Sequence, residues 1–83
     1  MSKSEKSLDR FLSIPADFTW DELVSVLGHL GFKELAQKGG SYRCFMSEQE
    51  LKIFLHKPHP SHIVPRYALR KVRLKLKEYG LIK

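Results

Sequence analysis

Three histidines in a short proline-containing segment are the residues of this chain best suited to acid–base chemistry. His56, His59 and His62 recur at every third position, and Lys57 follows the first of them. Imidazole has an ordinary pKa of about 6.5, so it can both accept and donate a proton at neutral pH. A histidine beside an ammonium group suits phosphate contact and RNA cleavage, and the alternative is that the segment only shapes a turn.

The same spacing could also indicate a metal site, but we do not predict one. Zinc sites usually recruit four protein ligands, or three and a water, and often include cysteine. No acidic residue lies close to these histidines in the sequence. Three ligands in so flexible a segment rarely fix a coordination geometry. We therefore expect no metal and no other cofactor.

The histidine segment follows a predicted hairpin. Gly39 and Gly40 favour a turn, and residues 42–46 then give a run rich in strand-forming side chains. Residues 51–56 alternate with a period of two, which predicts a second strand with its aliphatic side chains toward the core. Residues 47–50 are short and polar, so the strands should pair antiparallel. The sheet should end at the prolines that follow.

Two main helices and two weaker elements complete the pattern. Thr19 and Glu22 have capping-box spacing, so a helix should begin at Thr19 and end at Gly31. Its apolar stripe consists of Trp20, Leu23, Val24, Leu27 and Leu30. A second helix should run from Pro65 to Gly80 with Leu69, Val72, Leu76 and Tyr79 on its apolar face. Residues 4–13 predict a short helix that Pro15 stops, and residues 33–37 a first strand.

The positive charge of the chain is concentrated in its last third. Residues 1–50 carry six Lys and Arg against eight Asp and Glu, whereas residues 51–83 carry nine against one, which gives net charges of −2 and +8. Within the second helix the basic side chains form a stripe, namely Arg66, Arg70, Arg73 and Lys77. A stripe of one sign favours a polyanionic or acidic partner over a merely solvated helix face.

Length and composition exclude several classes of protein. A chain of 83 residues is one small domain, and its longest apolar run is too short for a membrane span. No signal peptide precedes the charged N-terminal segment, so we expect a cytoplasmic protein. The single cysteine, Cys44, cannot form an internal disulfide and is interpreted as a small strand hydrophobe.

These elements predict an α+β fold. Their order, α-β-β-β-α, forms a two-layer sandwich in which both main helices cover one face of the sheet, with a short extra N-terminal helix. We expect residues 1–18 to form an N-terminal extension and residues 19–83 a single domain.

Five segments of this chain together resemble the HicA family of toxins from bacterial toxin–antitoxin systems. They are residues 18–23 (FTWDEL), 30–32 (LGF), 39–41 (GGS), 56–60 (HKPHP) and 79–82 (YGLI). The resemblance covers about residues 17–82. It implies a fold like that of a double-stranded-RNA-binding domain, metal-independent cleavage of messenger RNA, and neutralisation by a HicB-like antitoxin. The toxin would be a monomer alone and a hetero-oligomer with its antitoxin.

The chain departs from the family pattern at Tyr42. Most of the family has a histidine after the Gly-Ser pair, thought to handle the proton of the attacking ribose hydroxyl, whereas Tyr42 follows Ser41 here. A tyrosine pKa of about 10 is too high for a good base at neutral pH, although the hydroxyl can donate a hydrogen bond. The family pattern also buries Phe45 and exposes Tyr42 and Cys44, whereas hydrophobicity alone could bury Cys44 and Met46.

The functional hypothesis is a HicA-like toxin that binds RNA and acts as an endoribonuclease. The candidate catalytic residues are Tyr42, His56 and His59, and the candidate RNA-binding residues are Lys57, Arg66, Arg70, Arg73 and Lys77. The alternatives are an RNA-binding module without catalysis and an adaptor that docks an acidic protein partner.

Overall fold

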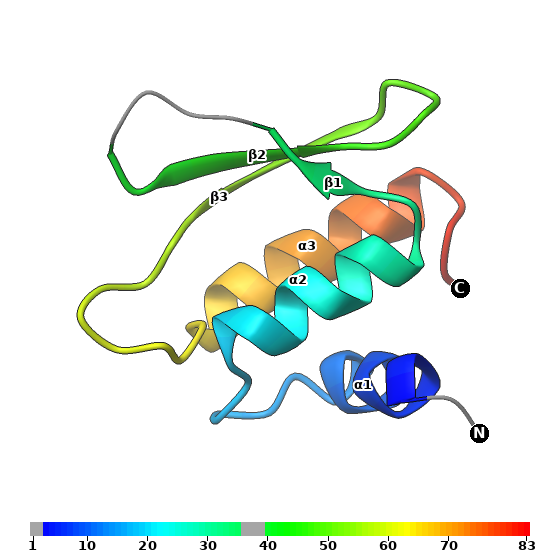
Figure 1. Ribbon diagram of the computed structural model, residues 1–83. Coiled ribbons are helices and arrows are strands. Elements are labelled where there is room, and N and C mark those ends of the chain that lie inside the picture. Colours follow the sequence, from blue (N-terminus) through cyan, green and yellow to red (C-terminus); the bar gives the residue numbers. More distant parts are fainter. Residues whose placement is uncertain (1–2, 36–39) are drawn as a thin grey trace.

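The structure of the chain is a computed structural model that describes residues 3–35 and 40–83 (Figure 1). Its elements in chain order are α1 (Lys3–Leu12), α2 (Trp20–His29), β1 (Lys33–Glu34), β2 (Tyr42–Met46), β3 (Lys52–His56) and α3 (Arg66–Glu78). This order confirms the predicted α+β class, including the short N-terminal helix. The predicted first strand is shorter than expected, because β1 ends at Glu34 and residues 36 and 37 lie outside the described part, as does Gly39.

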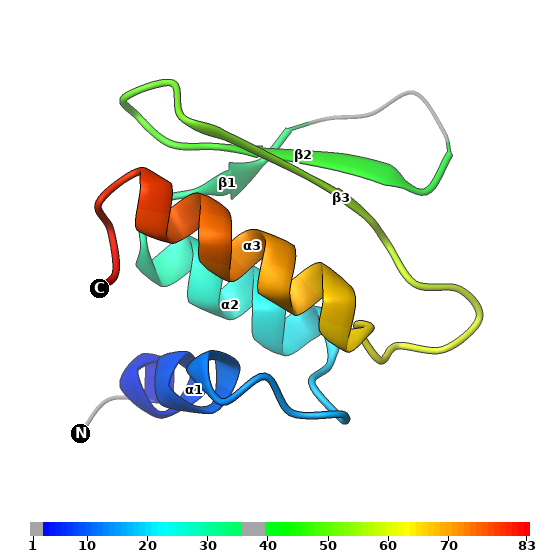
Figure 2. The same ribbon diagram turned by 180° about the vertical axis from the view of Figure 1, so that it is seen from behind.

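The sheet is antiparallel throughout and has the strand order β1-β2-β3. Helices α2 and α3 lie side by side under one face of it, and α1 lies on the far side of this helical layer (Figures 1 and 2). The other face of the sheet is covered by no helix in either view. We call it the outer face.

Alternation along β2 and β3 decides which side chains enter the core. Phe45 lies opposite Ile53 in the register, and both are buried in the core cluster with Leu55. Tyr42 is exposed, as the family pattern predicts. Cys44 is nevertheless 5% exposed, although it lies on the outer face opposite Phe54. The family pattern is therefore wrong about Cys44, whose burial the hydrophobicity alternative predicted, and that alternative is wrong about Met46, which is only half-buried.

The start of α2 forms as its sequence predicts. The Thr19 hydroxyl accepts a hydrogen bond from the backbone N–H of Glu22 at 3.1 Å, and the Glu22 carboxylate accepts one from the backbone N–H of Thr19 at 3.1 Å. This reciprocal pair is a capping box and satisfies two free N–H groups. Because α2 lies between the sheet and α1, it buries Val26 as well as Trp20, Leu23 and Leu27. Val24 and Leu30, which the stripe included, are only partly buried.

Helix α1 is attached to α2 and to the segment that precedes α2. Phe11 is completely buried, and the Arg10 guanidinium lies 2.8 Å from the Glu22 carboxylate and 3.1 Å from that of Asp17. The hydrogen bond from Arg10 lowers the pKa of Glu22 below its ordinary value. None of the helices within residues 3–35 and 40–83 is long and apolar enough to cross a bilayer.

Candidate functional site

Two of the predicted catalytic residues lie side by side on the outer face. Tyr42 and His56 are direct partners in the register of β2 and β3, and their ring centroids are 4.7 Å apart at an interplanar angle of 59°. Because side chains alternate along each strand, both point away from the core, and both are exposed. The structure therefore places the imidazole of His56 beside Tyr42.

A third aromatic side chain belongs to the same cluster and was not predicted from the sequence. Phe54 stacks on Tyr42 with ring centroids 5.7 Å apart and an interplanar angle of 11°. It is 51% exposed, an unusual environment for a phenylalanine ring. The alternation of residues 51–56 could have identified it, because Phe54 shares a strand face with Lys52 and His56. We call Tyr42, Phe54 and His56 the aromatic cluster.

The third predicted catalytic residue, His59, lies in a separate hollow beside the end of the sheet. The hollow has a volume of about 400 Å³ and is lined by Gly40, Ser41, Arg43, Lys57, Pro58, His59, Pro60 and His62. The Lys57 backbone N–H donates to the Ser41 carbonyl at 2.7 Å, which extends the strand pairing by one residue. The hollow thus gathers His59, His62 and Lys57, whereas Tyr42 and His56 do not line it.

The loop that carries these histidines is anchored at its far end. The backbone N–H of Trp20 donates to the His62 carbonyl at 2.7 Å, and the Val64 N–H donates to the Phe18 carbonyl at 2.8 Å. These bonds hold the loop against the start of α2. On the opposite wall of the hollow, the Arg43 guanidinium donates to the Gly40 carbonyl at 2.6 Å and lies 3.5 Å from the Glu34 carboxylate.

The basic stripe of α3 does not share the outer face with the aromatic cluster. The Arg66 guanidinium donates to the Ile14 carbonyl at 3.0 Å, and that of Arg73 donates to the Leu12 carbonyl at 3.3 Å. These carbonyls belong to the end of α1 and to the turn after it, so the stripe lies on the helical side of the molecule. Two of its four basic side chains therefore also contact the end of α1 and the turn after it, although all four residues of the stripe are exposed.

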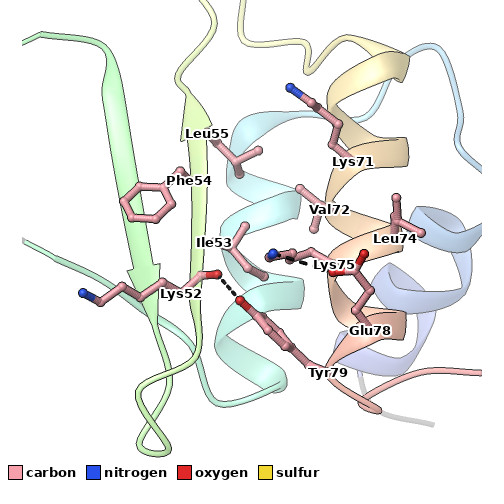
Figure 3. A pocket seen from close by; sticks show the side chains of 10 residues that line it. All are labelled: Lys52, Ile53, Phe54, Leu55, Lys71, Val72, Leu74, Lys75, Glu78 and Tyr79. Carbon is pink, nitrogen blue, oxygen red and sulfur yellow. Dashed lines mark hydrogen bonds and ion pairs between the residues drawn. The ribbon is translucent and has the colours of Figure 1, made fainter.

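A second hollow is a groove between β3 and α3 (Figure 3). It has a volume of about 440 Å³, with Ile53 and Leu55 on the strand side and Val72 and Leu74 on the helix side. The Tyr79 hydroxyl donates to the Lys52 carbonyl at 2.7 Å at one end of the groove. Its basic side chains are Lys52, Lys71 and Lys75. None of the predicted catalytic residues lines it.

Within the described part of the chain, no group of three His, Cys, Asp or Glu side chains is placed to hold a metal ion. The thiol of Cys44 is buried. The side chains around the end of the hairpin offer imidazole, phenol, guanidinium and ammonium groups.

Residues 20–81 match the sequence model of a family described as the HicA toxin of bacterial toxin–antitoxin systems. The chain belongs to the HicA toxin family. It is thus a toxin of a toxin–antitoxin system, and an antitoxin is its partner. Comparison with curated proteins and comparison with solved structures found no match.

In this HicA toxin the matched residues include β1 to α3 and all of α2, whereas α1 lies outside them. The contacts of Arg66 and Arg73 with the end of α1 therefore join the family fold to a segment outside the match. The aromatic cluster and the His59 hollow both lie within the matched residues.

Proposed function

We propose that this HicA toxin binds RNA and cleaves messenger RNA as a metal-independent endoribonuclease. The observation that carries the proposal is the position of His56, whose ring lies 4.7 Å from the ring of Tyr42 across the strand pair. Tyr42 occupies the position at which most of the family has a histidine. A proton-transfer group is thus available beside that position, although it comes from the neighbouring strand.

The reaction needs a base, an acid and positive charge. The base removes the proton of a ribose 2′-hydroxyl, whose oxygen forms a bond to the adjacent phosphorus, and the bond from phosphorus to the 5′-oxygen breaks as that oxygen receives a proton. The products are a cyclic phosphate and a free 5′-hydroxyl. Imidazole suits both proton transfers near neutral pH.

The arrangement of the residues suggests their roles. His56 is the proposed base, because it lies beside Tyr42 on the exposed strand pair. His59 is the proposed acid, and Lys57, which lies in the same hollow, would offset negative charge on the phosphate. The Tyr42 hydroxyl would donate a hydrogen bond to the substrate, since its ordinary pKa makes it a poor base.

The test is cleavage of a messenger RNA by the purified toxin with and without a chelator. His56→Ala and His59→Ala should each reduce cleavage by about 100-fold or more, while RNA binding survives, and chelator should have no effect. His29→Ala is the matched control, because His29 is an exposed histidine on α2. Cleavage that persists in both variants would contradict the proposed roles of these histidines, whereas a parent toxin that binds RNA without cleaving it would favour an RNA-binding module without catalysis.

We propose a HicB-like protein as the antitoxin, with the toxin monomeric when alone and hetero-oligomeric when neutralised. Membership of the HicA family supports this choice of partner. This choice of antitoxin is tested by expressing the toxin with and without the small protein encoded by the neighbouring gene. Growth arrest that this neighbour relieves is the expected result, and arrest that it does not relieve would exclude it as the antitoxin.

A second candidate function, an adaptor that docks an acidic protein, is supported by the groove of Figure 3. The strand order leaves β3 at the edge of the sheet, so its outward backbone groups could pair with an added strand. Lys71→Glu with Lys75→Glu should then abolish co-purification with the neighbouring protein. Toxicity that depends on these lysines but not on His56 would favour the adaptor over the nuclease.

A further inference from the structure

Two exposed aromatic rings lie on the outer face with their planes nearly parallel. Tyr42 is 46% and Phe54 51% exposed, and their rings are 11° from parallel. Figure 3 shows Phe54 pointing away from α3, in the direction opposite to Ile53 and Leu55. The phenylalanine ring therefore contributes little to the core, and its exposure needs another explanation.

The charge of the outer face suits an anionic ligand. The register places Lys33, Met46 and Lys52 in one row of this face and Tyr42 with His56 in another, and Phe54 lies opposite Cys44 between them. None of these residues is acidic, and Lys57 follows directly after β3. A surface that combines exposed aromatic rings with cations binds single-stranded nucleic acid by stacking the bases and attracting the phosphates.

We propose that Phe54 and Tyr42 form a stacking site for an unpaired base of single-stranded RNA. This inference rests on the proposed function and adds to it the class of substrate. A base that stacks on these rings would place its ribose beside His56, whose ring contacts that of Tyr42. Bases within a duplex already stack on one another, so this site should discriminate against double-stranded RNA.

The test uses two short oligonucleotides that the toxin cannot cleave through a 2′-hydroxyl. One is a single-stranded 2′-O-methyl oligoadenylate, and the other is an abasic oligomer of the same length and charge. Phe54→Ala should weaken binding of the oligoadenylate by about ten-fold or more and leave binding of the abasic oligomer unchanged, because only the base can stack. A duplex of the same sequence should bind more weakly than the single strand.

Two further variants test whether an aromatic ring at position 54 itself is needed for binding. Phe54→Trp should retain the affinity, and its indole fluorescence should be quenched by the oligoadenylate, while the buried Trp20 serves as the internal background. Tyr67→Ala is the matched control, because it removes a 64% exposed ring from α3 rather than from the sheet. It should leave the preference for oligoadenylate over the abasic oligomer unchanged.

The outcomes distinguish this inference from the proposed function. If both oligomers bind equally well and Phe54→Ala changes neither affinity, the stacking site is overturned while RNA binding stands. If neither oligomer binds, the proposed function fails with it. If Phe54→Ala binds RNA like the parent but no longer associates with the neighbouring antitoxin, the outer face is a protein interface and the inference is wrong.

Discussion

At the scale of single residues, the proposed mechanism depends on the contact between Tyr42 and His56. The register of β2 and β3 brings the imidazole of His56 beside the ring of Tyr42. His56 belongs to the HKPHP segment that resembles the family, so this imidazole lies beside the position where the chain departs from the family pattern. The proposed chemistry thus depends on a cross-strand pair that neither residue identifies by itself.

Restoring histidine in β2 tests this interpretation. Tyr42→His should raise RNA cleavage by about ten-fold, because it returns a group with a suitable pKa to the family position. Tyr42→Phe should lower cleavage only a few-fold, because it removes one hydrogen bond. Both rates are measured on the same messenger RNA. A Tyr42→His variant that gains nothing, in a parent that needs neither His56 nor His59, would exclude this surface as a nuclease site.

The depressed pKa of Glu22 gives a prediction about stability and pH. The lowered pKa in the folded state means that the unfolded chain binds the proton first as the pH falls. The charged Glu22 carboxylate therefore makes its full contribution to the free energy of unfolding above its ordinary pKa of 4.5. That contribution is lost as the pH falls through the lowered pKa of the folded state. Glu22→Gln should be less stable than the parent near pH 7, and the difference should shrink in acid.

Urea unfolding of parent and variant across this pH range provides the measurement. Asp21→Asn is the control, because it neutralises an exposed carboxylate in the same helical turn. A difference between parent and Glu22→Gln that stays constant from pH ~7 to pH ~3 would show that the ion pair with Arg10 contributes no stability.

At the scale of elements, α1 makes the helical layer two helices deep. It supplies Phe11 to the core and takes hydrogen bonds from Arg66 and Arg73 at its C-terminal end. Cationic side chains are favourable near the C-terminus of a helix, where carbonyl groups have no partner within the helix. The segment before the matched residues thus packs against the family fold and accepts hydrogen bonds from α3.

Truncation of Phe11 measures this contact. Phe11→Ala should lower the free energy of unfolding by about 3 to 5 kcal/mol, because it leaves a cavity where a fully buried ring lay. Lys6→Ala, at an exposed position of the same helix, should change it by less than about 0.5 kcal/mol. Urea denaturation of both variants gives the comparison. Equal stability of Phe11→Ala and parent would mean that α1 does not dock in solution.

At the scale of the whole molecule, the positive charge divides into regions on different sides of the domain. The aromatic cluster and Lys57 lie at the sheet, whereas the stripe of α3 lies on the helical side with two of its arginines held by α1. Arg70 and Lys77 are the stripe residues best suited to test contact with RNA, because the hydrogen bonds to the end of α1 and the turn after it come from Arg66 and Arg73.

Charge reversal tests the stripe without disturbing α1. Arg70→Glu with Lys77→Glu should weaken RNA binding by about ten-fold and reduce its dependence on salt, while the melting temperature stays close to that of the parent. Lys6→Glu with Lys83→Glu makes the same change of charge at exposed positions outside the stripe. If both double variants bind RNA equally, net charge rather than the stripe determines affinity.

The sequence alone determined the local features of this protein. The capping box at Thr19, the periods of the three helices and the alternation of β3 depend on neighbours within a few residues, so each could be predicted from its own segment. Family motifs and the charge of the last third also required no contact between distant segments. The fold class and the identity of the candidate histidines followed from these features.

Only the tertiary structure decided how these parts meet. The pairing of Tyr42 with His56, the exposure of Phe54 and the use of Arg66 and Arg73 to hold α1 join residues of different elements. A strand register and the docking of a helix minimise the free energy of the whole chain, and one segment contains no record of its distant partners. A basic stripe therefore looks uniform in the sequence, although the packing of α1 gives its members different contacts.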